Sequence, residues 1–380
     1  MSADLKNIVV IGASSAGSAA ARSLGKSLPS THRVILIEAA EAAFWPPSSL
    51  RAAVVEGWED KTFAPLDGFF AEGSRHVVRS STRVIEVSNS DVLVQTPAGT
   101  QERIPFEYAI LATGSTYPSP SRPVSDKLSE AKAAFKKLQS DIRKAKSILI
   151  IGGGEVGVEI AGEIRAVYPG DNKKVTLVSR SDRLIGKSTP PALHNKLYPQ
   201  LISRNVDVLL GDSVDLPKDI SSTSLLSEPR SFTSQNGADI PDVDLVIVAT
   251  GTKPAIDLFA KADPASIVDG QIKVDHKTLR ADSSVLTKWF AAGDVAQLPG
   301  LKTHVNAKTG GEVAAANIVS LLKGGKGDAK SFSVMNVTAV PLGPKAGAIN
   351  LFGWVFGEWT ISAIKGRSLF VGQFQGTYKP

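Results

Sequence analysis

The sequence predicts an α/β protein that uses one strand–loop–helix–strand unit twice. Residues 7–11 form a short apolar run that enters a Gly-rich turn, and residues 147–151 do the same 140 positions later. A second apolar run ends in Ala-Thr-Gly at Ala112–Gly114, and this pattern returns at Ala249–Gly251. Short apolar runs between turns are typical of buried parallel strands. The repeat therefore predicts two parallel sheets, each with its own helices.

Composition narrows the class of protein. The chain has 380 residues, of which 42% are hydrophobic and 21% are charged. At roughly 150 residues per domain, this length allows two or three domains with cores of their own. The apolar fraction excludes a disordered or fibrous chain. The net charge of +6 is dispersed and suits an anionic cofactor, so we expect no nucleic-acid partner.

Cysteine is absent from the sequence. This absence excludes disulfides, cysteine-ligated metals, thiol nucleophiles and a CxxC redox relay. The five histidines lack metal-ligand spacing, so we expect no metal. No apolar run approaches the length of a membrane-spanning helix, and the first strand begins too early for a targeting peptide. We therefore expect a cytoplasmic protein.

The first unit has the pattern of a dinucleotide-binding loop. Gly12 allows the tight turn after the strand, and Gly17 lets the helix approach that strand. Ser14 stands where a middle glycine is usual, and its small side chain can donate to a phosphate. Ser15 and Ala16 open the helix, where free backbone N–H groups bind anions.

Glu38 ends the second strand of this unit, 21 residues after Gly17. An acid at this place accepts hydrogen bonds from the ribose hydroxyls of a bound adenosine. The alternative is a surface glutamate without a ligand.

The second unit has the complete fingerprint Gly152, Gly154 and Gly157, with Glu155 at the start of its helix. Its second strand ends at Arg180 and has no acid. Without that carboxylate a 2′-phosphate is not repelled, and Arg180 can pair with it. Alternatively, Arg180 stacks on adenine or faces solvent. This unit is therefore expected to bind NADH or NADPH.

Three further stretches connect these units. Residues 116–125 are rich in Pro and Ser and predict a linker. Residues 127–146 have helical spacing with a solvated lysine face. Residues 219–242 are polar and contain an Asn236-Gly237 turn, which predicts a surface hairpin.

A third motif, Phe290-Ala291-Ala292-Gly293-Asp294, completes a resemblance to the two-dinucleotide-fold flavoprotein oxidoreductases. The resemblance implies a glutathione-reductase-like architecture of two Rossmann-like domains. It also implies that Asp294, after Gly293, hydrogen-bonds the ribityl chain of non-covalently bound FAD. The alternative for Asp294 is a helix N-cap. The resemblance adds further cofactor contacts from the two Ala-Thr-Gly ends, namely Ala112, Thr113, Gly114, Thr250 and Gly251.

Within this family the chain resembles the apoptosis-inducing-factor-like branch, which includes the ferroptosis-suppressor quinone reductases. The resemblance covers essentially the whole chain, and its particular marks are Ser49–Val54, Gly157–Ala161, Val340–Gly347 and Lys365–Val371. It implies that Arg51 lies near the flavin phosphates or ring. It also implies two catalytic residues, Glu159 beside the nicotinamide and Lys365 on the flavin side of the substrate region. For each of the three, an ordinary surface or helix position is the alternative.

The resemblance also implies a domain layout. FAD-binding segments are expected at 1–115 and 280–330, an NAD(P)H-binding domain at 116–279, and a small C-terminal α+β interface segment at 331–380. The helix at 308–322 would direct its positive N-terminus at reduced flavin. His304, just before it, is expected to be a loop histidine whose hydrogen bonds are satisfied.

Three functions follow from these expectations. The first passes hydride from NAD(P)H to FAD and electrons on to a small quinone-like acceptor. The second reduces a protein electron carrier, and the third is a redox-sensing binding protein like part of the apoptosis-inducing-factor family. The sequence leaves open the acceptor, the preference between NADH and NADPH, and a homodimer.

Aromatic residues near the C-terminus bear on membrane contact. Phe352, Trp354 and Phe356 alternate, and Trp359 follows them. They form either an inner wall of the C-terminal segment or an apolar channel or lip that touches a membrane. Lys345, Lys365 and Arg367 would then meet anionic lipid. Ser2 replaces the acylated glycine of the ferroptosis suppressors, so we expect at most transient contact with membranes or the mitochondrial outer surface.

Overall fold

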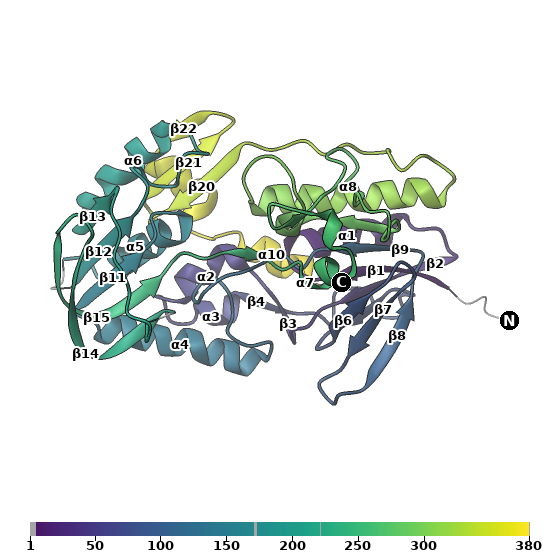
Figure 1. Cartoon of the computed structure of the whole chain (residues 1–380), viewed down its shortest axis with the longest axis horizontal. Helices are drawn as coiled ribbons and strands as arrows, with labels where there is room; N and C mark the ends of the chain where they lie inside the picture. The colour runs from purple at the N-terminus through teal and green to yellow at the C-terminus, as the bar shows by residue number, and fades with distance from the viewer. Residues whose placement is uncertain (1–4, 171–172, 221, 380) are drawn as a thin grey trace.

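The computed structural model describes residues 5–170, 173–220 and 222–379. The molecule is elongated and has two lobes, each built on a five-stranded sheet (Figure 1). The lobe near the N-terminus holds the first predicted unit, and the other lobe holds the second. The predicted α/β class is therefore confirmed.

The first sheet is parallel throughout and has the order β19-β9-β1-β2-β5. Its strands are β1 (Lys6–Ile11), β2 (His32–Ile37), β5 (Val77–Arg79), β9 (Tyr108–Leu111) and β19 (Trp289–Ala291). β19 pairs with β9, so a late segment of the chain returns to this sheet. Val9 and Val10 of β1 are fully buried because helices and loops cover both faces of the sheet.

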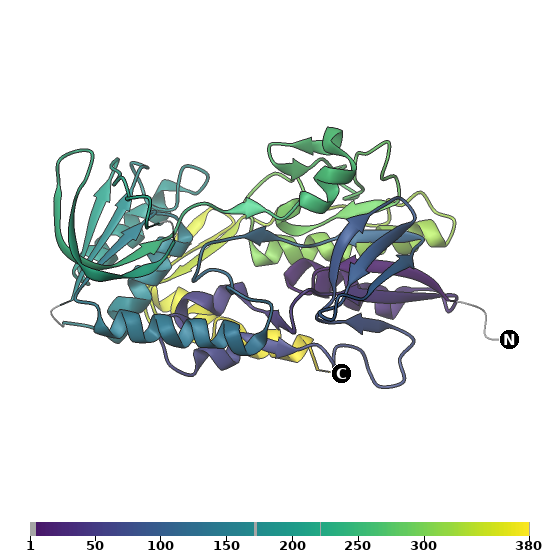
Figure 2. The ribbon, with the colours of Figure 1, turned by 60° about the horizontal axis from the view of Figure 1, so that its bottom comes forward.

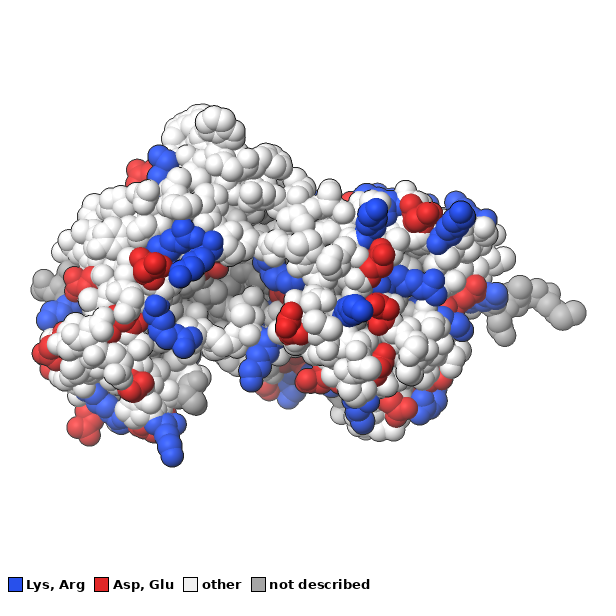
Figure 3. Space-filling model, turned by 45° about the horizontal axis from the view of Figure 1, so that its top comes forward, with Lys and Arg blue, Asp and Glu red and all other residues white. Residues whose placement is uncertain are grey.

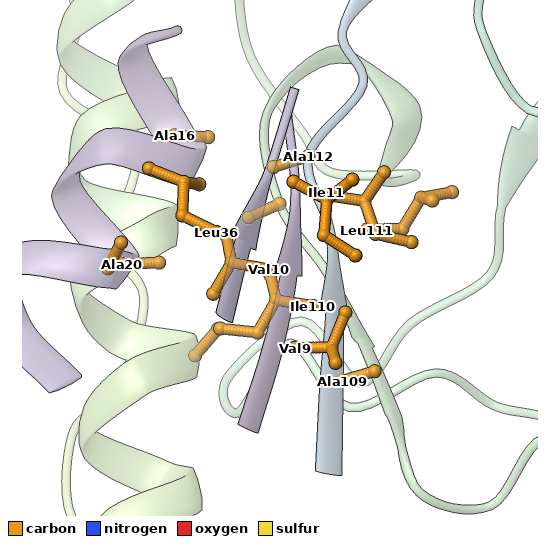
Figure 4. Packing of buried hydrophobic residues seen from close by; sticks show 14 of the residues in the cluster. Val9, Val10, Ile11, Ala16, Ala20, Leu36, Ala109, Ile110, Leu111 and Ala112 are labelled. Atoms are coloured by element: carbon orange, nitrogen blue, oxygen red, sulfur yellow. The ribbon is translucent and has the colours of Figure 1, made fainter. Parts of the chain in front are cut away.

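Helices α1 (Ser15–Ser27) and α8 (His304–Leu322) pack on one face of this sheet (Figure 1). Figure 4 shows Ala16 and Ala20 of α1 directed toward Val10 and Leu36 of the sheet. The two helices approach closely because their contact surface is made of small residues. A Cβ atom at Gly311 of α8 would lie 2.0 Å from the carbonyl oxygen of Ala16. This packing fixes the start of each helix beside the loop after β1.

The second sheet has the order β13-β12-β11-β15-β14. Its strands are β11 (Ser147–Ile151), β12 (Lys174–Ser179), β13 (Val206–Leu210), β14 (Ser224–Thr233) and β15 (Asp239–Val248). β14 and β15 form the predicted antiparallel hairpin, which extends from the end of the lobe (Figure 2). The flanking helices are α4 (Leu128–Lys144), α5 (Glu155–Val167) and α6 (Pro191–Ile202). α4 confirms the helix predicted at 127–146.

The remaining elements form smaller layers. The other strands are β3 (Ala42–Phe44), β4 (Phe63–Pro65), β6 (Arg83–Val87), β7 (Asp91–Gln95), β8 (Gln101–Pro105), β10 (Ser115–Thr116), β16 (Lys253–Pro254), β17 (Ile267–Val268), β18 (Gln271–Ile272), β20 (Val337–Pro341), β21 (Gly347–Leu351) and β22 (Trp354–Phe356). The other helices and helical turns are α2 (Pro46–Ala52), α3 (Trp58–Lys61), α7 (Asp257–Ala262), η1 (Pro264–Ser266), η2 (Gly293–Val295), α9 (Glu358–Ile361), the π-helical turn η3 (Ser362–Gly366) and α10 (Val371–Thr377). No helix in the described ranges is long and apolar enough to cross a membrane.

Two features join the lobes. The strands β10 and β16 lie on the two chain segments that connect the sheets, and they pair with each other. An apolar cluster also includes Leu50 of α2, Ile142 of α4, Ile160 of α5 and Val340 of β20. The segment around α2, the second lobe and the C-terminal segment therefore share one apolar cluster, while the first sheet has a core of its own.

The aromatic residues near the C-terminus are exposed. Trp354 is 76% exposed and Trp359 is 84% exposed, with Phe352 and Phe356 also at the surface. The interpretation of these residues as an inner wall is therefore wrong. Val355 alone points from β22 toward the core, because successive side chains of a strand face opposite sides.

Candidate functional site

The two Gly-rich loops have the same backbone crossing. A Cβ atom at Gly17 would lie 1.7 Å from the carbonyl oxygen of Gly12, and one at Gly157 would lie 1.9 Å from that of Gly152. The first glycine of each loop has a positive φ, +99° for Gly12 and +122° for Gly152. Each loop therefore requires glycine at both places, and each ends at the N-terminus of a helix that attracts anions.

The loop of the first lobe is held by Glu38. Its Oε2 atom accepts a hydrogen bond of 2.7 Å from the backbone N–H of Ala13, and Oε1 accepts one of 3.1 Å from Ala40. Burial raises the pKa of the Glu38 carboxyl, while the two amides act in the opposite direction. Ser14 donates to the carbonyl of Phe44 at 3.3 Å. Glu38 thus lies against the loop at the place expected for a ribose-binding acid.

The other predicted groups of this lobe meet at the same sheet edge. Ala112 donates its N–H to Ile11 at 2.9 Å, and Ala292 donates to Leu111 at 3.0 Å, so the ends of β1, β9 and β19 lie together. Asp294, after Gly293, accepts a hydrogen bond of 2.9 Å from the hydroxyl of Ser115, which follows Thr113 and Gly114. Segments separated by nearly 180 residues thus form one site.

Arg122 is a site residue that the sequence analysis missed. Its guanidinium lies over Gly114, where a Cβ atom would come 2.8 Å from Nη2. Its Nε is buried and has no hydrogen-bond acceptor among the described residues. Burial lowers the pKa of Arg122, and the nearby charges of Asp294 and Glu38 oppose that effect. A buried N–H without an acceptor is costly, so this position favours an anionic ligand.

The signal for Arg122 in the sequence was weak. It is the only basic residue in the stretch 115–126, which otherwise reads as a Pro- and Ser-rich linker. A single arginine in such a stretch, soon after an Ala-Thr-Gly end, is the one feature of the sequence that points to this residue.

The loop of the second lobe is more open. Among the residues that the structure describes, no atom lies within 4 Å of where a Cβ atom at Gly154 would be, and Glu155 at the helix start is exposed. Arg180 is exposed at the end of β12. Thr250, before Gly251, packs against the loop because a Cβ atom at Gly152 would lie 2.8 Å from its methyl group. Figure 3 shows the surface hollowed between the two lobes, with Lys and Arg along the edge of the hollow.

Glu159 and Lys365 are brought together although they lie 206 residues apart. The Nζ of Lys365 in η3 donates to Oε1 of Glu159 in α5 at 3.1 Å and to the carbonyl of Ala339 at 2.8 Å. Their side chains are 10% and 12% exposed. Burial raises the pKa of Glu159 to about 7, and Lys365 opposes this rise. The pair is therefore nearly enclosed, and the raised pKa of Glu159 lies close to neutral pH.

Arg51 occupies a buried ion pair. Its guanidinium donates to both carboxylate oxygens of Glu163 in α5, with distances of 2.7–3.0 Å, and to the carbonyl of Arg367 at 3.2 Å. Both side chains of the ion pair are 3% exposed. All of these partners are protein groups, and they join α2 to the second lobe and to the C-terminal segment. The position of Arg51 near the flavin phosphates or ring, which the resemblance implies, stays a prediction.

His304 is the first residue of α8 and not a loop residue. Its Nδ1 lies 2.6 Å from the hydroxyl of Ser15 in the first Gly-rich loop, and its ring meets Trp45 edge-on at 4.4 Å. Burial lowers the pKa of His304 to about 4, and the charge of Lys365 contributes to that shift. The charge of Lys365 thus disfavours protonation of His304.

Comparison with known proteins gives one consistent result. The family model for pyridine nucleotide-disulphide oxidoreductases matches residues 6–311. Apoptosis-inducing factor homolog A of Dictyostelium discoideum is 30% identical, over 97% of this chain and 91% of that protein. Ferroptosis suppressor protein 1 of Homo sapiens is 28% identical, over 96% of this chain and 94% of that protein.

Solved structures agree on the fold. The water-forming NADH oxidase from Lactobacillus brevis superposes with a TM-score of 0.70 at 19% identity, over 90% of this chain and 74% of that chain. The NAD-dependent persulfide reductase from A. fulgidus gives 0.69 at 20% identity, over 92% of this chain and 63% of that chain. The present chain thus spans less than two thirds of the latter structure.

Proposed function

The chain belongs to the pyridine nucleotide-disulphide oxidoreductase family, and we propose that it transfers electrons from NAD(P)H to a small quinone-like acceptor. FAD and an NAD(P)H donor are the cofactors of this family. The observation that carries the proposal is the enclosed Lys365–Glu159 pair, because a quinone takes up protons along with electrons. The sequence has no cysteine, so an acceptor must be reduced without a disulfide relay.

The residues of the first lobe fit FAD. Arg122 has a buried Nε without an acceptor, and a diphosphate supplies the missing oxygen and negative charge. The N–H groups at Ser15–Gly17 would bind the same diphosphate, Glu38 would bind the ribose, and Asp294 would bind the ribityl chain. When bound, FAD accepts a hydride from the nicotinamide and returns the electrons to a second substrate.

The second lobe would hold the nicotinamide dinucleotide. Gly152, Gly154 and Gly157 leave room for its diphosphate, while Thr250 and Gly251 border the same loop. Arg180 would pair with a 2′-phosphate because it is exposed at the end of β12. Glu155 would stand at the mouth of this site.

Lys365 and Glu159 would supply the acceptor with a proton. The ammonium of Lys365 is held by two oxygen atoms, so one N–H remains to donate to an acceptor carbonyl. Glu159, whose pKa is raised to about 7, takes up a replacement proton from solvent near neutral pH. NAD(P)H, one proton and a quinone would then give NAD(P)⁺ and a quinol.

Arg51 would act as a positioning residue. Its bidentate bond to Glu163 fixes α5 one turn beyond Glu159. Breaking a buried pair of this kind costs about 3–5 kcal/mol, so Arg51 would keep the proton-transfer pair in register.

The test uses purified protein loaded with FAD. Oxidation of NADH and NADPH is followed with a water-soluble quinone, with a protein electron carrier coupled to cytochrome c, and with ferricyanide. We expect turnover with the quinone, and its loss in Lys365→Met with ferricyanide turnover retained. Turnover only with the carrier would favour the protein-carrier alternative. Flavin reduction without turnover on any acceptor would favour the redox-sensing alternative.

A further inference from the structure

The C-terminal segment carries an exposed aromatic surface, formed by Phe352, Trp354, Phe356 and Trp359 and called here the aromatic tip. Their exposed fractions are 66%, 76%, 42% and 84%. Trp354 and Phe356 lie on the outer face of β22, since Val355 between them packs on the core. Large aromatic side chains at the end of a projection are unusual on a surface that only meets water.

The backbone holds the aromatic tip in a fixed shape. Phe352 and Gly353 form the turn between β21 and β22, both with positive φ. Asn350 is fully buried, accepts from the N–H of Gly353 at 3.0 Å and donates to Asn336 at 2.9 Å. In Figure 3 an uncharged projection stands at the upper left of the molecule, the place of β22 in Figure 1. The exposed rings are thus built into the fold and need no rearrangement to meet a partner.

Cationic side chains lie on the same C-terminal segment as the aromatic tip. The hydroxyl of Ser362 donates to the carbonyl of Pro344 at 3.0 Å and accepts from Nε of Arg367 at 3.3 Å. Ser362 therefore joins the backbone next to Lys345 to the side chain of Arg367. Both basic residues are exposed. The only acid between residues 344 and 367 is Glu358, whose charge is matched by Arg204 at 3.0 Å. The segment that carries the aromatic tip therefore has more basic than acidic residues.

The same segment leads to the candidate site. Ile364 is 40% exposed on η3, and the next residue, Lys365, turns inward to Glu159. One short helical turn thus joins the exposed surface to the proposed proton donor.

We propose that the aromatic tip docks on the surface of a phospholipid bilayer and so receives apolar quinones from it. This proposal rests on the proposed quinone reduction. Tryptophan and phenylalanine on a projecting turn enter the headgroup region, and Lys345 and Arg367 meet anionic headgroups. The four rings would bury on the order of 500 Å², whereas a stable interface between two copies needs about 800 Å² from each.

The experiment measures binding of the full FAD-loaded chain to vesicles. Vesicles of phosphatidylcholine alone and with added phosphatidylserine are sedimented, and tryptophan fluorescence is read with brominated lipid as quencher. Trp45 and Trp289 are buried and Trp58 is partly buried, so quenching reports mainly on the exposed Trp354 and Trp359. We expect binding that phosphatidylserine strengthens and salt weakens, and quenching of the exposed tryptophans.

Variants test the aromatic tip directly. Trp354→Ser combined with Trp359→Ser should weaken vesicle binding about tenfold or more, because two interfacial anchors are removed. The control Val285→Ser removes an exposed apolar residue elsewhere, 53% exposed, and should bind as the parent does. The double variant should keep its turnover with a water-soluble quinone and lose turnover with a quinone confined to vesicles.

Two results would overturn the proposal. One is vesicle binding that is absent or equal in the parent and the double variant. The other is a dimer in solution that the double variant abolishes while neither protein binds vesicles, because the surface would then join two copies. Failure of the proposed quinone reduction is a separate result, since it appears as lost turnover with the water-soluble quinone in the parent protein.

Discussion

The two Gly-rich loops of this protein share a backbone and differ in how much protein surrounds them. In the first lobe, Glu38 binds the N–H of Ala13, and the hydroxyl of Tyr378 donates to the carbonyl of the same residue. Tyr378 follows α10 and is 3% exposed, so the far end of the chain covers this loop. The first loop is therefore enclosed from two sides.

The second loop is covered at one position and open at the next. The carbonyl of Gly153, which corresponds to Ala13, accepts a hydrogen bond of 2.8 Å from the backbone N–H of Ile185. At Gly154, in contrast, no atom of the described residues lies within 4 Å of the position of a Cβ atom, and Arg180 beyond it is exposed. An enclosed loop suits a cofactor that stays bound, and an open loop suits a donor that enters and leaves in every turnover. We therefore expect the surroundings of each motif, and not its glycines, to set how fast its bound dinucleotide exchanges.

The largest effect is expected when the last glycine of each loop is changed. Gly17→Ala places a methyl group 1.7 Å from a carbonyl oxygen, so the purified variant should lack FAD. Gly157→Ala should keep FAD and lose reduction by NADH, because the equivalent clash at 1.9 Å lies in the other loop. Flavin absorbance per mole of protein checks both. Gly372→Ala, which meets nothing within 4 Å, serves as the control, and loss of flavin from both loop variants would break the comparison.

The next effect concerns pH and the buried acid of the second unit. Glu159 has its pKa raised from 4.5 to about 7, so between these values the folded protein keeps a proton that the unfolded chain has lost. The free energy of unfolding therefore falls as pH rises through this window, by up to about 3 kcal/mol. Urea unfolding of Glu159→Gln should lack this decline when compared with the parent. Parallel pH curves for the two proteins would contradict the expectation.

Arg122 bears on this comparison because its guanidinium lies over Gly114 in the first lobe and has no counterpart described at the second loop. Arg122→Gln removes a buried positive charge and should weaken FAD binding about thirtyfold, the equivalent of about 2 kcal/mol. Binding of NADH, measured on protein saturated with FAD, should change little. FAD fluorescence during titration of the apoprotein gives the dissociation constant. An unchanged FAD affinity would show that Arg122 only fills the space beside Gly114.

The smallest effect is expected at the open loop. Arg180→Ala should raise the KM for NADPH about tenfold and leave that for NADH within about twofold, because only the former has a 2′-phosphate. Steady-state kinetics with both donors and one quinone measure the difference. Equal changes would indicate that Arg180 contacts the adenine, which the two donors share.

Local patterns predicted much of the fold. The apolar runs, the paired glycines and the turn at Asn236-Gly237 correspond to β1, β11 and the β14–β15 hairpin, because each pattern depends on neighbouring residues. The resemblance added Glu159 and Lys365 as single residues. Their contact could not be predicted, since it joins two segments 206 residues apart through the core.

Buried charges escaped prediction for a related reason. Arg51 and Glu163 are ordinary residues in their helices, and only the packing of α2 on α5 makes them a pair. Exposure of the aromatic tip was equally hidden, because alternation along a strand tells which side chains share a face and not which face meets solvent. Long-range packing decides both.

The pairing of β10 with β16 has a consequence for how this chain can be rearranged. Both connections between the lobes pass through one ribbon, so the segment between them begins and ends about 5 Å apart. Such a segment can be exchanged as a cassette between related chains without stretching the backbone. A transplanted cassette would carry Glu159 and Glu163 away from Lys365 and Arg51, leaving two buried carboxylates without counterions. In a stable chimaera, Lys365 and Glu159 should therefore come from the same parent protein, and so should Arg51 and Glu163.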